Sequence, residues 1–149
     1  MNKRQYDYLM RLAELKNRTK DDFERTVFDI VCCAYQSYLL GKRQTKYVEK
    51  EHLLQVLVSK GFLTSRIEGK LPDDRRLRET CRNLLKRGYP IMASSVTNGY
   101  FIADDVSEVQ QPMNENHKRA LEILAAERGY KTAIQFMLGQ SALKGVENG

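Results

Sequence analysis

The chain has 149 residues, of which 42% are hydrophobic and 30% are charged, and its formal net charge is +6. This length suits one domain of ordinary size with short extensions, and the hydrophobic content excludes a wholly disordered protein. No apolar run approaches the roughly 18 residues that cross a bilayer, and no signal-peptide segment follows the N-terminus. We therefore expect a cytoplasmic protein without a membrane partner, whose positive charge suits a polyanion.

The distribution of charge along the chain and the cysteine content narrow the class of protein further. Lysine and arginine concentrate in residues 1–20 and 66–88, whereas residues 104–115 are acidic and contain neither. The three cysteines, Cys32, Cys33 and Cys81, have no CxxC spacing, so they provide neither a disulfide framework nor a zinc knuckle. We expect all three to be small buried hydrophobic residues.

Apolar periodicity predicts four helices in the first 87 residues. The first covers 3–16, with Tyr6, Leu9, Met10 and Ala13 on one face. A second, strongly apolar helix begins after a cap at Asp21 or Asp22 and runs to about residue 40. The third covers 49–59 and the fourth covers 73–87, each followed by a glycine that suits a helix C-terminus.

After the fourth helix, the residue pattern changes from the helical period to the two-residue alternation that is typical of strands. Asn98-Gly99 separates two short extended runs, and this dipeptide favours a type I′ turn with positive φ at both residues. We therefore predict a two-stranded hairpin over 90–103. The remainder is expected to be an acidic linker containing Pro112, a helix from about 116 that Gly129 breaks, a short helix over 132–138, and a frayed end at 139–149.

Residues 21–103 resemble small winged helix-turn-helix proteins of phages and other mobile elements. The similarity lies in three helices followed by a hairpin, in the segment 72–91 with its Asp-Arg-Arg-Leu-Arg and Gly-Tyr-Pro-Ile motifs, and in the wing end Gly-Tyr-Phe-Ile-Ala at 99–103. One departure is the stretch 62–71, longer than the tight turn of such domains, which is either a loop insertion or a sign that the preceding helix is misplaced. The resemblance implies a mainly α fold with a small antiparallel β-hairpin, in which a winged helix-turn-helix core (21–103) lies between an N-terminal helical extension (1–20) and a C-terminal segment (104–149).

The resemblance makes residues 73–87 the recognition helix, and the residue pattern agrees. Leu77, Cys81, Leu84 and Leu85 share one face, which leaves a polar face for a major groove. Arginine and asparagine are the side chains that read guanine and adenine, so we place Arg75, Arg76, Glu79 and Asn83 nearest the bases and Arg82 and Lys86 at phosphates. The full predicted DNA-binding set is Arg75, Arg76, Arg78, Glu79, Arg82, Asn83 and Lys86, with Thr97 and Asn98 at the wing tip.

The sequence lacks the residue patterns that an enzyme active site would require. His52 and His117 are the only histidines and lie in no metal-binding motif, and the sequence has no phosphate-binding glycine loop or nucleophile elbow. The pairs Asp73/Asp74 and Asp104/Asp105 suit a helix cap and a strand exit. We therefore predict no catalytic residue, no metal and no cofactor.

The expected function is binding of double-stranded DNA, as a transcriptional regulator or as a DNA-binding accessory of a phage or mobile element. The alternative is a protein-interaction adaptor built on a winged helix, because one fold serves both purposes. An RNA binder is a weaker alternative, since no RNA-binding module is present. The terminal helices carry apolar stripes, which raises the hypothesis of a homodimer that binds two half-sites.

Overall fold

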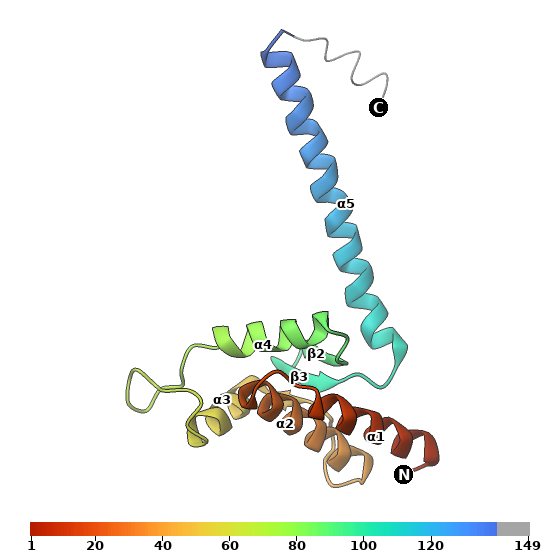
Figure 1. The fold of residues 1–149 in the computed structure, drawn as a ribbon, viewed down its shortest axis with the longest axis vertical. Coiled ribbons are helices and arrows are strands. Elements are labelled where there is room, and N and C mark those ends of the chain that lie inside the picture. The colour runs from red at the N-terminus through yellow and green to blue at the C-terminus, as the bar shows by residue number, and fades with distance from the viewer. Residues whose placement is uncertain (140–149) are drawn as a thin grey trace. The chain divides into compact units, whose positions relative to one another are not determined.

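A computed structural model describes residues 1–139 of the chain (Figure 1). The contacts divide it into two compact units, Met1–Asp105 and a second that begins at Val106. The first unit holds seven elements: α1 (Lys3–Asn17), α2 (Asp22–Leu39), β1 (Val48–Glu49), α3 (Lys50–Ser59), α4 (Arg75–Lys86), β2 (Ile91–Ser94) and β3 (Gly99–Ile102). The second unit holds α5 (Val106–Met137).

Helix α2 is the centre of the first unit. Asp21 caps it by accepting a hydrogen bond from the Glu24 amide at 2.8 Å. Its buried stripe packs against α1, α3, α4 and β3. The fully buried large side chains come from every layer: Leu12 of α1, Phe28 and Tyr35 of α2, Leu53 and Leu57 of α3, Leu77 and Leu84 of α4, and Ile91 and Ile102 of the sheet.

Helix α1 packs through a different face from the one predicted. Leu12 is buried and Tyr8, Leu9 and Leu15 pack against the core, whereas Tyr6 and Met10 are exposed. The α1 sequence carries two overlapping apolar stripes, so periodicity alone selected the wrong one. The buried face of α1 is favoured by contacts with residues distant in sequence. One example is the hydrogen bond that the Tyr8 hydroxyl donates to the Ala103 carbonyl.

The hairpin is present and is part of a three-stranded antiparallel sheet of order β1-β3-β2. Strand β1, two residues long, was not expected, and it pairs Val48 with Tyr100 and Glu49 with Gly99. The turn also differs from the predicted type I′. Asn98 has a positive φ of 51°, but Gly99 already belongs to β3 and pairs with Ser94.

These elements confirm the predicted fold class, which is mainly helical with a small antiparallel hairpin placed after four helices. Helix α3 lies where the sequence placed it, so the departure at 62–71 is a long loop. Glycines at the predicted helix ends, Gly41, Gly61 and Gly88, have positive φ.

Helix α5 replaces the predicted linker and helical pair. It continues through Pro112 and Gly129 and ends at Met137, so both predicted breaks were wrong. One glycine costs a helix only about 1 kcal/mol relative to alanine, and the residues around Gly129 are good helix formers. The predicted frayed end lies outside the described residues, apart from Gly139.

Gly99 is required by a close approach of two backbones. A Cβ at this position would lie 2.1 Å from the Val48 carbonyl oxygen. We expect Gly99→Ala to lower the free energy of unfolding by about 1–3 kcal/mol, because β1 must move away from β3. Urea unfolding measures this loss. The control is Gly129→Ala, where the new Cβ meets nothing within 4 Å; wild-type stability of the Gly99 variant would contradict the prediction.

Candidate nucleic-acid interface

Helix α4 is fixed to the core by one narrow apolar stripe. Leu77 and Leu84 are fully buried, Cys81 is 5% exposed, and the helix contacts α2 and β2. Burial raises the pKa of the Cys81 thiol to about 12, which keeps it neutral as expected of a small core residue. Leu85, predicted to share this face, is 40% exposed. The stripe therefore leaves most of the helix circumference at the surface.

The other two cysteines differ from the prediction. Cys33 is exposed, and Cys32 is half-buried at the border of the core, against which it packs. Burial, followed by the charge of Asp29, raises the pKa of both thiols.

The outward face of α4 carries five exposed polar side chains without intramolecular ties. They are Arg75, Glu79, Arg82, Asn83 and Lys86. Within residues 1–139 none of their side chains makes a hydrogen bond or an ion pair. Arg75, Glu79 and Asn83 follow one another at intervals of four residues, which places them along one line of the helix surface. This face is available to an external ligand without breaking any internal contact.

Two other predicted site residues are engaged in the fold. The Arg76 guanidinium lies 3.9 Å from the centre of the Phe23 ring and donates to the Phe62 carbonyl at 3.1 Å. Arg78 pairs with Asp74 one turn earlier, at 3.0 Å. Both remain exposed, but their charged groups already have partners.

Aspartates hold the start of α4 in place. The Asp73 carboxylate accepts from the Arg75 amide at 2.6 Å, and Asp74 binds Lys50 at 3.2 Å as well as Arg78. Burial tends to raise the pKa of Asp74, but the hydrogen bonds from Lys50 and Arg78 outweigh it and hold that pKa below its ordinary value. The predicted helix cap is thus an ion-paired anchor.

Lys50 joins the wing to the start of α4. Its amide donates to the Asn98 carbonyl at 3.1 Å, while its ammonium group binds Asp74. The predicted tip residues Thr97 and Asn98 are exposed, and their neighbour Val96 is 93% exposed. The structure therefore connects the two segments that the sequence assigned to one interface, although the tip itself offers no cation.

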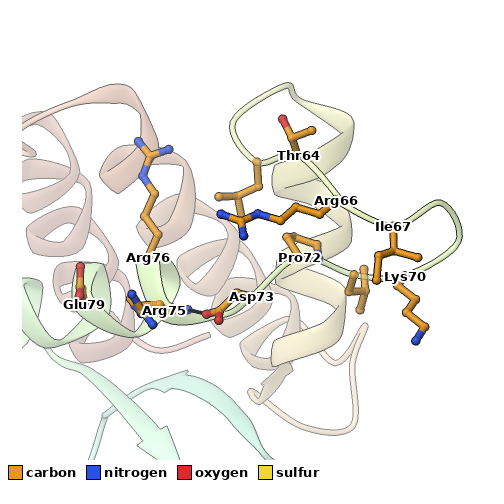
Figure 2. Close-up of a pocket in the computed structure, with 11 residues that line it drawn as sticks. Thr64, Arg66, Ile67, Lys70, Pro72, Asp73, Arg75, Arg76 and Glu79 are labelled. Atoms are coloured by element: carbon orange, nitrogen blue, oxygen red, sulfur yellow. Dashed lines mark hydrogen bonds between the residues drawn. The ribbon is translucent and has the colours of Figure 1, made fainter.

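A hollow of about 650 Å³ lies between the start of α4 and the loop that follows α3 (Figure 2). Arg66 points from this loop back toward α4, and Arg75 and Arg76 lie on the helix side. The charged lining residues are Arg66, Lys70, Asp73, Arg75, Arg76 and Glu79, four cations against two acids. Arg66 and Lys70 were absent from the predicted site, although the clustering of arginine and lysine over 66–88 was the signal for them.

A second hollow of about 380 Å³ lies between the other half of α4 and the start of α2. Its cations are Lys20, Arg76, Lys86 and Arg87. Arg87 is not free, because it forms an ion pair with the buried Glu24 and lies 5.3 Å from the centre of the Tyr89 ring. Lys20 is contributed by a segment that the sequence did not connect to α4. The two hollows share Arg76, so cations lie beside both halves of α4 on the side of the helix that carries this residue.

A comparison with models of known protein families finds no match, and comparisons with curated proteins and with solved structures find none either. Among residues 1–139 no helix combines the length and the apolar content needed to cross a membrane. The same residues contain no group of three His, Cys, Asp or Glu side chains placed to hold a metal ion.

The anchor at Asp74 predicts a pH-dependent stability. Asp74→Asn removes the charge that Lys50 and Arg78 stabilise, and we expect a loss of about 1 kcal/mol at neutral pH. Because the pKa of Asp74 is lowered in the folded protein, its contribution is complete above about pH 5 and disappears as the pH falls through that lowered pKa. The two proteins should therefore converge in stability in acid.

Urea unfolding at a series of pH values measures this convergence. The control is Asp7→Asn, since Asp7 is exposed on α1 and has no ion-pair partner in the described part of the chain. A difference between wild type and Asp74→Asn that stays constant with pH would contradict the assignment.

Proposed function

We propose that the protein binds double-stranded DNA, with α4 in the major groove and the β2–β3 hairpin beside it. The observation that carries this proposal is the division of α4 into a buried apolar stripe and an outward face of uncommitted polar side chains. The major groove is wide enough for one α-helix, and such helices dock by their polar face. A helix surface that serves only solvation does not need further cations from two other segments, Lys20 and the Arg66/Lys70 loop, beside it.

The side chains along α4 suit two kinds of contact. Arg75 and Asn83 carry the groups that pair with guanine and adenine, and Glu79 is able to accept from the amino group of cytosine. Arg82 and Lys86 suit phosphates, which position the protein without specifying sequence. Arg76 and Arg78 support the interface through their ties to Phe23, Phe62 and Asp74 and contribute charge.

The two hollows extend the proposed contact to the DNA backbone. Arg66 and Lys70 lie beside the start of α4, and Lys20 lies beside its second half. Cations placed along the length of an inserted helix are able to reach the phosphates of one DNA strand, so these residues supply the sequence-independent part of the affinity.

The cellular role in this proposal comes from the family resemblance alone. It makes the protein a transcriptional regulator or a DNA-binding accessory of a phage or mobile element, acting in the cytoplasm where that DNA lies. No catalytic step, metal or cofactor forms part of it.

Fluorescence anisotropy with a mixed-sequence duplex, at about 50 and 200 mM salt, tests the proposal. Wild-type affinity should fall with salt, and Arg75→Ala/Arg82→Ala should weaken binding and reduce the salt slope by about 1, because Arg82 is the one of the two residues placed at a phosphate and each phosphate no longer neutralised removes about one unit of slope. The matched control is Arg4→Ala/Arg11→Ala, which removes the same charge at the same spacing from α1. If both double variants weaken binding equally, the loss of affinity comes from net charge alone, which would contradict a specific interface on α4.

Sequence preference separates base reading from backbone binding. Asn83→Ala should relax the preference at one position of a selected site while changing affinity for random duplex little, because asparagine reads adenine edges. Selection from a randomised duplex library with wild type and variant measures this. A folded protein that binds no duplex even at low salt would overturn the proposal in favour of the protein-interaction adaptor.

A further inference from the structure

Helix α5 has no buried residue over its 32 residues. Large apolar side chains along it are more than half exposed, among them Val106, Met113, Ile123, Tyr130 and Met137. Helices in proteins owe most of their stability to packing of an apolar face. The apolar residues of α5 therefore need a surface that covers them.

Most of these side chains follow a heptad repeat, and Leu121, Leu124 and Phe136 lie outside it. Positions spaced alternately by three and four residues are Val106, Val109, Met113, Asn116, Ala120, Ile123, Glu127, Tyr130, Ile134 and Met137. Eight of the ten are apolar, and they lie on one side of the helix as in the seam of a coiled coil. Pro112 falls beside this seam and not in it.

The two polar seam residues define how a second copy would pair. Asn116 and Glu127 are equally distant from the middle of the repeat, so antiparallel pairing places each of them opposite the other. Every remaining seam position then faces an apolar one: Val106 with Met137, Val109 with Ile134, Met113 with Tyr130, and Ala120 with Ile123. A parallel pair would instead place two Glu127 carboxylates against each other in the seam, which like-charge repulsion disfavours.

Charge complementarity supports the same register. The Asn116 amide oxygen accepts from Arg119 at 3.0 Å, which leaves its amino group as a donor for a carboxylate. Glu127 is exposed and pairs only loosely with Lys131, at 3.5 Å. Antiparallel pairing brings the Asn116–Arg119 donors of one copy to Glu127 of the other, twice by symmetry.

The area is sufficient for a stable pair. Burying one Val, Ile or Met side chain removes on the order of 60–120 Å² from water. Seven large seam residues in each copy then remove roughly 800–1,700 Å² in total, which reaches the range of specific interfaces.

We infer that α5 is a dimerisation helix whose partner is a second copy of this chain, paired antiparallel with Asn116 opposite Glu127. The inference narrows the hypothesis of a homodimer through the terminal helices to the C-terminal one. It does not depend on DNA binding, because every seam residue lies outside Met1–Asp105.

Analytical ultracentrifugation of the full chain tests the pairing at concentrations up to about 100 µM. Wild type should be dimeric, and Ile123→Asp should raise the dimer Kd by roughly 100-fold or more, because it places a charge in an apolar layer of each copy. The matched control is Leu121→Asp, which introduces the same charge at another exposed aliphatic residue two positions away, outside the seam. It should remain dimeric.

A charge exchange tests the orientation. Asn116→Asp/Glu127→Lys places opposite charges face to face in the antiparallel pair, so the dimer should persist or tighten. In a parallel pair the same variant sets Asp against Asp and Lys against Lys, and the dimer should weaken. The thermal transition of the first unit verifies folding of each variant.

Three results would overturn the inference. If the wild type stays monomeric at the highest concentration, the chain does not dimerise. If Ile123→Asp and Leu121→Asp have equal effects, the proposed seam is not the interface. If the charge exchange weakens the dimer, the pairing is not antiparallel. DNA affinity takes no part in any of these readouts, so the two proposals fail separately.

Discussion

The insertion of Leu77, Cys81 and Leu84 into the core is the interaction on which the candidate site depends. These three side chains cover one stripe of α4 and meet α2 and the hairpin. Because a helix presents about one residue every 100°, fixing this stripe also fixes which polar residues face outward. A rotation of α4 by one residue would bury an arginine without a partner, at a high cost in free energy. The apolar packing therefore determines the rotational setting of the charged face.

Ion pairs add a second constraint at both ends of α4. Asp74 joins the helix start to Lys50, and through the Lys50 amide to the base of the wing. Arg87 joins the helix end to Glu24 in α2. Charges used in this way are already engaged within the fold, which explains why a dense run of arginines contains only a few uncommitted ones. The same contacts keep the outward face of α4 and the hairpin in a fixed relation, as a shared ligand would require.

The two compact units bury their apolar residues in different ways. The first has a core that draws on every helix and strand it contains, so it needs no partner to satisfy its apolar side chains. Helix α5 has the opposite character, with an apolar seam and nothing in its own unit to cover it among the described residues. A domain that carries a ligand-binding face together with a helix that pairs copies would present two such faces, a common arrangement in proteins that recognise symmetric sites.

The order and boundaries of the helices in the first unit followed from local signals. Asp21, Gly61 and Gly88 marked helix ends, and Asn98-Gly99 marked the hairpin, because capping and turn formation depend on a few adjacent residues. The outward face of α4 was predicted for the same reason: its apolar spacing is unambiguous. Resemblance contributed the expectation that this face meets DNA.

Other features were decided only by tertiary structure. The buried face of α1 depends on Ala103 and α2, strand β1 forms only where β3 offers an edge, and Gly99 is needed because Val48 approaches it from a distant part of the chain. The partners of Arg76 and Arg87 lie far away in sequence, so periodicity placed Arg76 at the DNA bases and gave no partner for Arg87. The continuity of α5 was missed because Gly129 and Pro112 are both local signals of a helix end. Gly129 costs only about 1 kcal/mol, which the helix-forming residues around it outweigh, whereas Pro112 costs about 3 kcal/mol and the helix continues through it nonetheless. The sequence by itself determined what depends on neighbours within a few residues, and the fold decided what depends on contacts between distant segments.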